Sequence, residues 1–204
     1  SCHPIQDIQV LCPMRKGPLG VHQLNQVLQK ALNPPHHSKR EKEYRQVLFR
    51  EGDKVMQIKN NYNIPWKILN RFGYPLEEGI GVFNGDTGRI TAITPTAETV
   101  TVTFDDNKVI EYDYSQLDEL EHAYAITIHK AQGSEYPAVI LPIHSGPPML
   151  MSRNLLYTGV TRAKDLVVII GIESTLERMV DNNREINRYS GLRQHLQKLS
   201  EMYR

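Results

Sequence analysis

Hydrophobic positions along the chain change their spacing twice. Near the start, Ile5 to Leu11 has the pattern of a short strand. Apolar residues within 19–32 then recur at helical spacing, so we expect an amphipathic helix that ends at Asn33-Pro34-Pro35. Residues 36–51 are polar and charged, which predicts a linker or an exposed turn of helix.

The middle of the chain has the alternating pattern of short β-strands. Lys54 to Lys59 alternates, and Asn84-Gly85-Asp86 is a turn signal before a run that ends at Thr94. Thr99 to Phe104 and Lys108 to Tyr112 flank a second turn, which indicates another hairpin. Several short strands in so small a segment predict a small all-β barrel.

Strand and helix patterns alternate in the last third of the chain. In order, they predict a short helix, a buried strand, a helix, a second strand and two terminal helices: Ala125 to Ala131, Ala138 to Ile143, Asn154 to Ala163, Leu166 to Ile170, Ser174 to Asp181 and Leu192 to Leu199. This alternation implies an α/β fold, a parallel sheet with helices on its faces. We therefore expect a discontinuous α/β domain of residues 1–51 and 121–204, with the barrel of residues 52–120 inserted.

The distribution of charge agrees with this division. Residues 1–51 carry a net charge of +4 and residues 121–204 a net charge of +2, whereas residues 52–120 hold 11 acidic against 6 basic side chains. A basic patch on the flanks could meet phosphate. Three unrelated stretches of solvated surface would have the same charges.

Composition excludes several classes of protein. With 40% apolar and 23% charged residues among 204, the chain has a globular composition, and no apolar run approaches the roughly 18 residues of a membrane span. Cys2 and Cys12 form no CxxC pair, and the eight histidines show no HxxxH spacing, so we expect no metal site. These features favour a reducing, cytoplasmic setting and no membrane partner. The start at Ser1, without a methionine or a signal region, suggests a fragment of a longer polypeptide.

The first segment with candidate chemistry is Thr127 to Tyr136, which reads TIHKAQGSEY. Gly133 permits a tight turn and close approach of a ligand, and Glu135 could hold a ribose hydroxyl. Donors to a sugar–phosphate chain are available from Thr127, His129, Lys130 and Gln132. The same residue types would also fit a capped helix followed by a solvated turn.

The second segment is Leu155 to Lys164, which reads LLYTGVTRAK. The guanidinium of Arg162 offers forked donors to phosphoryl oxygens, so it could stabilise charge that develops during phosphoryl transfer. A favourable interaction with the helix dipole would also explain an arginine at this position.

Together these motifs resemble a known family. The order of Pro13 to Gly20, the GDKVMQIKNNYN…VFNGDTGRI stretch, HKAQGSEY and YTGVTRAK is similar to that in the second RecA-like domain of superfamily 1 helicases. Nearly the whole chain resembles the RecD-like branch, superfamily 1B, which includes exodeoxyribonuclease V alpha chains. The resemblance implies a RecA-like, P-loop NTPase-type domain with an inserted SH3-like barrel.

The resemblance also implies roles for individual residues on two sides of the domain. ATP would lie between two RecA-like domains, with Arg162 as the arginine finger on the γ-phosphate. The other nucleotide contacts would be Gly133, Glu135 and, from the motif IV region, Arg15 or Lys16. Contacts to single-stranded DNA would come from Thr127, His129, Lys130, Asn60, Asn61 and Tyr62. Tyr62 could instead pack in the barrel rim. Translocation in this family runs 5′ to 3′.

One departure bears on activity. The sequence contains no GxxxxGK[ST] loop and no acidic strand after it for magnesium, which belong to the first RecA-like domain. We therefore expect that ATP and Mg²⁺ are used only by a full-length enzyme and that this chain alone neither hydrolyses ATP nor unwinds DNA. The alternative is a non-catalytic module whose barrel binds DNA or recruits a protein partner, and the acidic barrel favours a protein partner.

Overall fold

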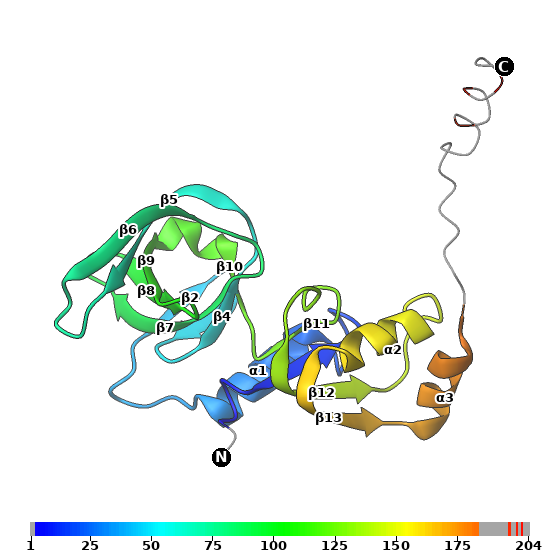
Figure 1. Cartoon of the computed structure of the whole chain (residues 1–204). Helices are drawn as coiled ribbons and strands as arrows, with labels where there is room; N and C mark the ends of the chain where they lie inside the picture. Colours follow the sequence, from blue (N-terminus) through cyan, green and yellow to red (C-terminus); the bar gives the residue numbers. More distant parts are fainter. Residues whose placement is uncertain (1–2, 184–195, 197–198, 200, 202–204) are drawn as a thin grey trace.

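The computed structural model describes residues 3–183 together with Leu196, Leu199 and Glu201. Two sheets dominate it (Figure 1). One is a parallel sheet of four strands in the order β11-β1-β12-β13. Its strands are β1 (Ile8–Cys12), β11 (Ala125–Thr127), β12 (Tyr136–Ile143) and β13 (Ala163–Gly171). The α/β fold expected from the alternation of strands and helices is therefore confirmed.

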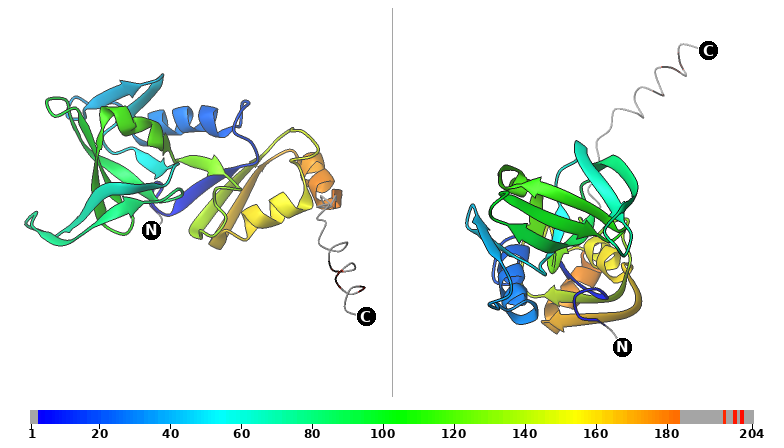
Figure 2. Two further views of the ribbon diagram at one scale, coloured as in Figure 1. Left: turned by 90° about the horizontal axis from the view of Figure 1, so that it is seen from above. Right: turned by 90° about the vertical axis from the view of Figure 1, so that its left-hand side faces the viewer.

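Helices lie on both faces of this sheet (Figure 2). They are α1 (Val21–Leu32), α2 (Arg153–Val160) and α3 (Glu173–Asp181). On one face α1 packs against Val10, Cys12 and Ala125. The opposite face forms the larger core, with α2 and α3 over residues that include Leu11, Ile126, Val139, Leu141 and Ile143. This arrangement buries side chains from both faces of β1 and β12, as a parallel sheet requires.

The second sheet closes around its own core. Its seven strands are antiparallel in the order β10-β4-β7-β8-β9-β5-β6. They are β4 (Lys54–Gln57), β5 (Asn61–Leu69), β6 (Pro75–Val82), β7 (Thr87–Thr94), β8 (Thr99–Phe104), β9 (Lys108–Asp113) and β10 (Leu120–His122), with the 3₁₀-helix η1 (Tyr114–Glu119) before β10. In β8, Val100, Val102 and Phe104 point inward between half-buried threonines, so strict alternation buries one face.

Two expectations about local structure are wrong. Residues 36–51 contain the hairpin of β2 (Glu41–Tyr44) and β3 (Val47–Arg50), not a linker or a turn of helix. Arg45 and Gln46 both have positive φ at its turn, and Phe49 is buried in the barrel core. Charged side chains on the outer face of this hairpin conceal the strand pattern.

The second wrong expectation is the helix from Ala125 to Ala131. Its first three residues form β11, which pairs with β1, and the rest form turns. The hairpin of β5 and β6 was also not foreseen, because Pro65 and Gly79 interrupt its apolar pattern. The helix from Asn154 to Ala163 is confirmed as α2 to within a few residues. The helix expected from Leu192 to Leu199 lies largely outside the described residues.

A buried carboxylate, Asp53, joins the barrel to the α/β part of the chain. Its Oδ1 accepts hydrogen bonds from Asn33 Nδ2 at 2.7 Å and Tyr124 OH at 2.9 Å. Its Oδ2 accepts from Gln29 Nε2 at 2.6 Å and lies 3.0 Å from His122 Nε2. Burial raises the pKa of this carboxyl, but hydrogen bonds from His122 and Asn33 outweigh that effect, so the net pKa is below its usual value.

A buried lysine reinforces the same junction. Lys54 Nζ donates to Ile5 O and to Gln9 Oε1, both at 3.0 Å. Gln9 Nε2 in turn donates to Ala123 O at 3.0 Å. Consecutive residues at the start of β4 therefore fix the barrel to α1 and to β1.

Candidate functional site

The motif residues divide between the two edges of the parallel sheet. The loop after β1 contains Arg15 and Lys16, and Lys130 follows β11, so these residues lie at the carboxyl edge. Glu135 precedes β12 and Arg162 precedes β13, so both lie at the amino edge. The eight residues of β12 separate the edges by roughly 25 Å.

At the amino edge, Arg162 follows the C-terminus of α2 and is half-buried. Its Nε donates to Thr158 O, its Nη1 to Ser134 O and its Nη2 to Thr161 Oγ1, each at 3.2 Å. All three acceptors are neutral. No carboxylate among the described residues pairs with this guanidinium. The amino edge therefore holds a positive charge that is positioned but not neutralised.

The local sequence explains this placement. Ser152 caps α2 by accepting a hydrogen bond from Leu155 N, and Gly159 lets the helix lie close to the sheet. A Cβ at Gly159 would stand 2.9 Å from Leu141 Cδ2. Tyr136 N donates to Arg162 O at 2.8 Å, so the two motifs are joined through their main chains.

The neighbouring loop contains the other two residues expected at the nucleotide. Gly133 has a φ of +89°, and a Cβ there would meet no atom within 4 Å, so the loop needs glycine for its conformation and faces open space. Glu135 is exposed and pairs weakly with Lys164 at 3.5 Å. The structure thus brings Gly133, Glu135 and Arg162 to one edge.

A cleft of about 280 Å³ opens beside this edge. Ser134, Glu135 and Tyr136 line it from the sheet, and the barrel contributes Arg89 and Asp105. Sequence reasoning did not connect the barrel with this edge, because contact across 45 residues of chain leaves no local pattern.

At the carboxyl edge, Glu121 lies between two cations. Arg15 Nη2 donates to Glu121 Oε1, and Lys130 Nζ lies 3.4 Å from Glu121 Oε2. Burial raises the pKa of the Glu121 carboxyl, but Lys130 and Arg15 lower it by more. Thr127 Oγ1 accepts from Lys130 N at 3.2 Å, and His129 is exposed on the same turn. Thr127, His129 and Lys130 therefore lie together at this edge.

The structure does not bring the motif IV cations to Arg162. Arg15 and Lys16, which we expected near the nucleotide, are exposed at the carboxyl edge, because they follow the C-terminal end of β1. Asn25, which lies in α1, is buried and acts structurally. Its side chain accepts from Ala125 N at 2.8 Å and donates to Ala125 O at 2.9 Å, which closes the outer edge of β11.

The barrel loop contains an exposed aromatic pair. Tyr62 is 63% exposed, and its ring stands edge-on to Phe83 with centroids 5.8 Å apart. Asn60 connects the two loops, because its Oδ1 accepts from Asn84 N at 2.9 Å and its Nδ2 donates to Tyr62 OH at 3.1 Å. Phe83 was missed from the sequence, although its place beside the NGD turn was a signal.

Asn61 differs from its neighbours. Its Nδ2 donates to Glu119, and its Oδ1 accepts from Ile64 N at 3.1 Å. Both polar groups of the half-buried Asn61 are thus engaged by other barrel residues, whereas Asn60 and Tyr62 are exposed.

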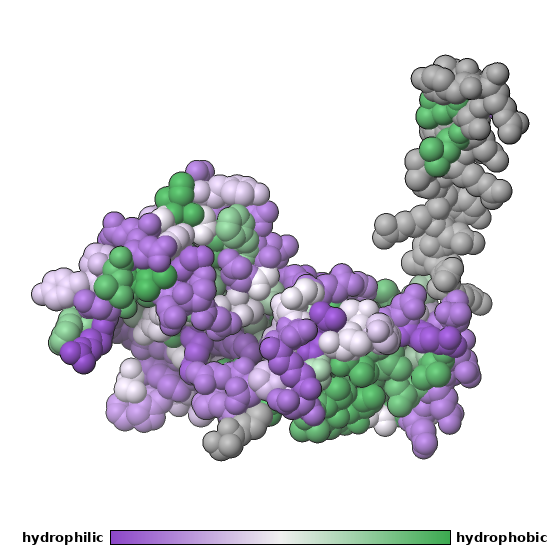
Figure 3. Space-filling view, viewed as in Figure 1, coloured by the Kyte–Doolittle hydropathy of each residue, from purple (hydrophilic) through white to green (hydrophobic). Residues whose placement is uncertain are grey.

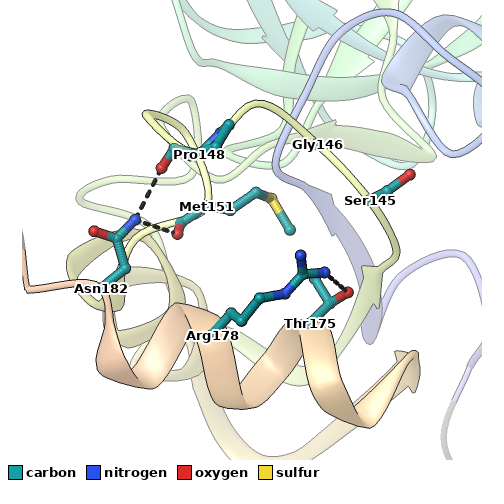
Figure 4. Close-up of a pocket in the computed structure, with 7 residues that line it drawn as sticks. All are labelled: Ser145, Gly146, Pro148, Met151, Thr175, Arg178 and Asn182. Carbon is teal, nitrogen blue, oxygen red and sulfur yellow. Dashed lines mark hydrogen bonds between the residues drawn. The ribbon is translucent and has the colours of Figure 1, made fainter.

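A further pocket of about 280 Å³ lies between the loop after β12 and α3 (Figure 4). Asn182 Nδ2 ties the helix to this loop by donating to Pro148 O and Met151 O, both at 2.8 Å. Arg178 Nη2 donates to Thr175 Oγ1 at 2.9 Å. None of the motif residues lines this pocket.

In the described part of the chain, no helix is long and apolar enough to cross a membrane. No group of three histidine, cysteine, aspartate or glutamate side chains is arranged there to hold a metal ion.

The fold resembles that of solved Pif1 helicase structures. The crystal structure of Bacteroides Pif1 bound to ssDNA matches 95% of this chain and 46% of that chain, with 18% identity and a TM-score of 0.51. A structure described as the basis for DNA unwinding at forked dsDNA by two coordinating Pif1 helicases has the same identity and TM-score. At this identity the likeness shows the fold alone.

Sequence comparisons identify the branch. Residues 24–104 match the SH3 domain of ATP-dependent RecD-like DNA helicases, and residues 122–170 match the UvrD-like helicase C-terminal domain. The ATP-dependent RecD2 DNA helicase of Deinococcus radiodurans is 37% identical over 178 residues, which are 87% of this chain and 22% of the relative. The RecBCD enzyme subunit RecD of Mycolicibacterium smegmatis is 28% identical over 195 residues, 94% of this chain and 30% of the relative.

The chain belongs to the RecD-like helicases and corresponds to a C-terminal part of them. It spans less than a third of the length of these two relatives. The expected RecA-like fold with an SH3-like domain is confirmed.

Proposed function

We propose that this chain is the C-terminal motor half of an ATP-dependent 5′–3′ DNA helicase, with Arg162 as its arginine finger. The observation that carries the proposal is the guanidinium at the amino edge, which is held by neutral oxygens alone within the described structure. A cation positioned in this way can move onto a phosphoryl group without breaking an ion pair. In this proposal residues 52–120 are the inserted barrel, and residues 1–51 and 121–204 are the second RecA-like domain, which contributes Phe49 to the barrel core.

On the nucleotide side, Glu135 and Gly133 would contact ATP bound mainly by the preceding RecA-like domain. The open space at Gly133 and the exposed carboxylate of Glu135 suit a sugar hydroxyl. Mg²⁺ would supply charge neutralisation at the phosphates, and its protein ligands would come from that other domain. The isolated chain would then neither hydrolyse ATP nor unwind DNA.

On the DNA side, Thr127, His129 and Lys130 would contact the backbone of a single strand. Arg15 and Lys16 share their edge, so we assign these two cations to DNA rather than to the nucleotide. The segment from Thr127 to Tyr136 crosses from the carboxyl edge to the amino edge. It would therefore couple the binding and hydrolysis of ATP to the affinity for the single strand.

The barrel would add further contacts to the strand. Tyr62 is exposed enough to stack on a base, a contact worth about 1–3 kcal/mol. Asn60 would lie beside it, and Asn61 would support the loop from within.

Replacement of the finger in the full-length protein tests this assignment. Arg162→Ala should lower ATP turnover by about 10³- to 10⁵-fold and leave single-strand affinity largely intact. Arg178→Ala is the matched control, because Arg178 also donates its Nε to the carbonyl four residues earlier but lies on α3. Normal turnover in Arg162→Ala would reject the role. Unwinding of substrates with only a 5′ or only a 3′ tail tests the direction.

The second candidate function is a binding module with no catalytic part. It is favoured by the acidic barrel and by exposed apolar side chains on β6 and in the turn before it, which include Leu76, Phe72 and Tyr74. Salt-dependent binding of a single-stranded oligonucleotide separates the two, since the helicase assignment requires binding that weakens with salt. Absence of such binding in the full-length protein would favour a protein partner.

A further inference from the structure

One part of the parallel sheet is apolar and uncovered. Leu166, Val168 and Ile170 share a face of β13 and are 55%, 38% and 57% exposed. Val168 is in register with Ile140 of β12, which is only half-buried. Figure 3 shows a broad hydrophobic area over these strands. Parallel strands are normally buried on both faces, so this area marks a missing layer.

The uncovered area lies beside α1, on the same face of the sheet. Register places Val10 opposite both Ala125 and Ile140, and α1 packs over Val10 and Ala125. A hollow of about 150 Å³ runs between α1 and the sheet, with Leu28, Val10 and Ile140 among its lining residues. The flank of α1 thus continues directly into the uncovered part, which has room for a second helix.

The two edges of the sheet differ in whether a further strand can pair with them. The edge at β11 is closed by Asn25, which bonds both main-chain polar groups of Ala125. Among the described strands, β13 has a neighbour on one side only. A further strand can therefore be added at β13 but not at β11.

The hand of the connections selects the route of the missing chain. From β1 to β11 the chain passes along α1 on one face. The connection from β11 to β12 contains Ile128, and the connection from β12 to β13 contains α2. Both connections run in the opposite direction across the sheet and lie on its other face. All three connections thus have the same hand. A chain of this hand that runs from a strand beyond β13 to β1 must cross on the α1 face, over Val168 and Ile140.

We propose that a strand–helix unit that precedes β1 in a longer polypeptide completes this domain. Its strand would pair in parallel with the free edge of β13. Its amphipathic helix would lie beside α1 and cover Leu166, Val168 and Ile170. The relatives extend far beyond the matched region, which leaves ample chain for such a unit. The inference concerns the folding of this domain, and it holds whether or not Arg162 acts as a finger.

The unit would also support the amino edge. β13 begins at Ala163, directly after Arg162, and it is held on one side only by β12. A second neighbouring strand would fix the start of β13, and with it the main chain of Arg162.

The test compares Ile170→Asp in two backgrounds, this 204-residue chain and the natural longer polypeptide. Ile80→Asp on β6 is the matched control, because Ile80 is also an exposed isoleucine on an edge strand. In the short chain both substitutions should leave the urea midpoint nearly unchanged. In the longer polypeptide, Ile170→Asp should lower the midpoint of this domain clearly and Ile80→Asp should not. Equal effects of the two substitutions there would overturn the proposal.

Hydrogen exchange gives a second, independent measurement. The β13 amides not bonded to β12 should exchange at least 100-fold more slowly in the longer polypeptide than in the short chain. Protection already present in the short chain would overturn the proposal. Protection that depended on protein concentration would mean that a second copy of the chain covers β13. Protection that disappeared on deletion of residues 184–204 would mean that this C-terminal segment covers it. Neither measurement uses ATP turnover, so their outcome is independent of the proposed helicase function.

Discussion

The carboxylate of Asp53 offers the sharpest test of how the barrel is held, through the substitution Asp53→Ala. The side chain is fully buried and accepts five hydrogen-bond donors. After truncation, Asn33 Nδ2 keeps its hydrogen bond to Glu51 O, and Gln29 Nε2 keeps its hydrogen bond to Leu48 O. The donors left without an acceptor are Arg50 N, Tyr124 OH and the His122 ring.

The cost follows from those three donors. An unsatisfied buried donor costs about 1–3 kcal/mol, and relaxation or entry of water brings the sum toward its lower half. We therefore expect a loss of about 3–5 kcal/mol in the free energy of unfolding, comparable to breaking a buried ion pair. For a chain of this size, that lowers the melting temperature by roughly 6–20 °C.

Urea unfolding should be followed by fluorescence and by circular dichroism in parallel. The single tryptophan, Trp66, lies in β5 and reports on the barrel, whereas circular dichroism reports on both parts. In the wild type the two transitions should coincide, and in Asp53→Ala they should separate. Asp106→Ala is the control, because the exposed Asp106 side chain only pairs with Lys108 Nζ and accepts a hydrogen bond from Lys108 N. A loss below 1 kcal/mol, with coincident transitions, would refute the reasoning.

The same carboxylate predicts a dependence on acid. The pKa of Asp53 is lower in the folded state than in the unfolded chain, so its stabilisation is complete above the unfolded pKa of about 4. That stabilisation is lost as the pH falls through the folded value. Acid titration of stability should show a smaller loss for Asp53→Ala than for the wild type, and identical losses would contradict the shift.

Three more predictions follow from single contacts. Burial lowers the pKa of Lys54 from 10.5 to about 8, so the unfolded chain binds the proton of this side chain more tightly than the folded chain. The free energy of unfolding should therefore rise as the pH increases from about 8 to 10.5. A series of urea titrations should show this rise in the wild type and not in Lys54→Met. Glu121→Ala frees Arg15 and Lys130, so single-strand affinity should increase and the salt slope should steepen by about 0.7 per added phosphate contact, whereas an unchanged slope would place both cations off the strand. Gly88→Ala would put a Cβ 2.6 Å from Thr103 O, and it should cost about 1–3 kcal/mol in a thermal melt.

The candidate site shows how much of a functional site can be predicted from short sequence motifs. Gly133, Glu135 and Arg162 were selected from two short motifs, and the structure places them at one edge because each precedes a parallel strand. Asn61 looked equivalent to Asn60 and Tyr62, yet its amide is used within the barrel. Residue type cannot distinguish an amide that faces solvent from one that bonds to the backbone of its own loop.

The amino-acid sequence by itself determined the elements whose periodicity is local. The alternation in β8, the helical spacing of α1 and the motif order were sufficient for an α/β domain with an inserted barrel, since side-chain period follows directly from backbone geometry. Tertiary structure alone decided which edge each motif reaches, how Asp53 joins two parts and why β13 remains uncovered. Those properties depend on contacts between residues far apart in the chain, and such contacts leave no periodic trace along it.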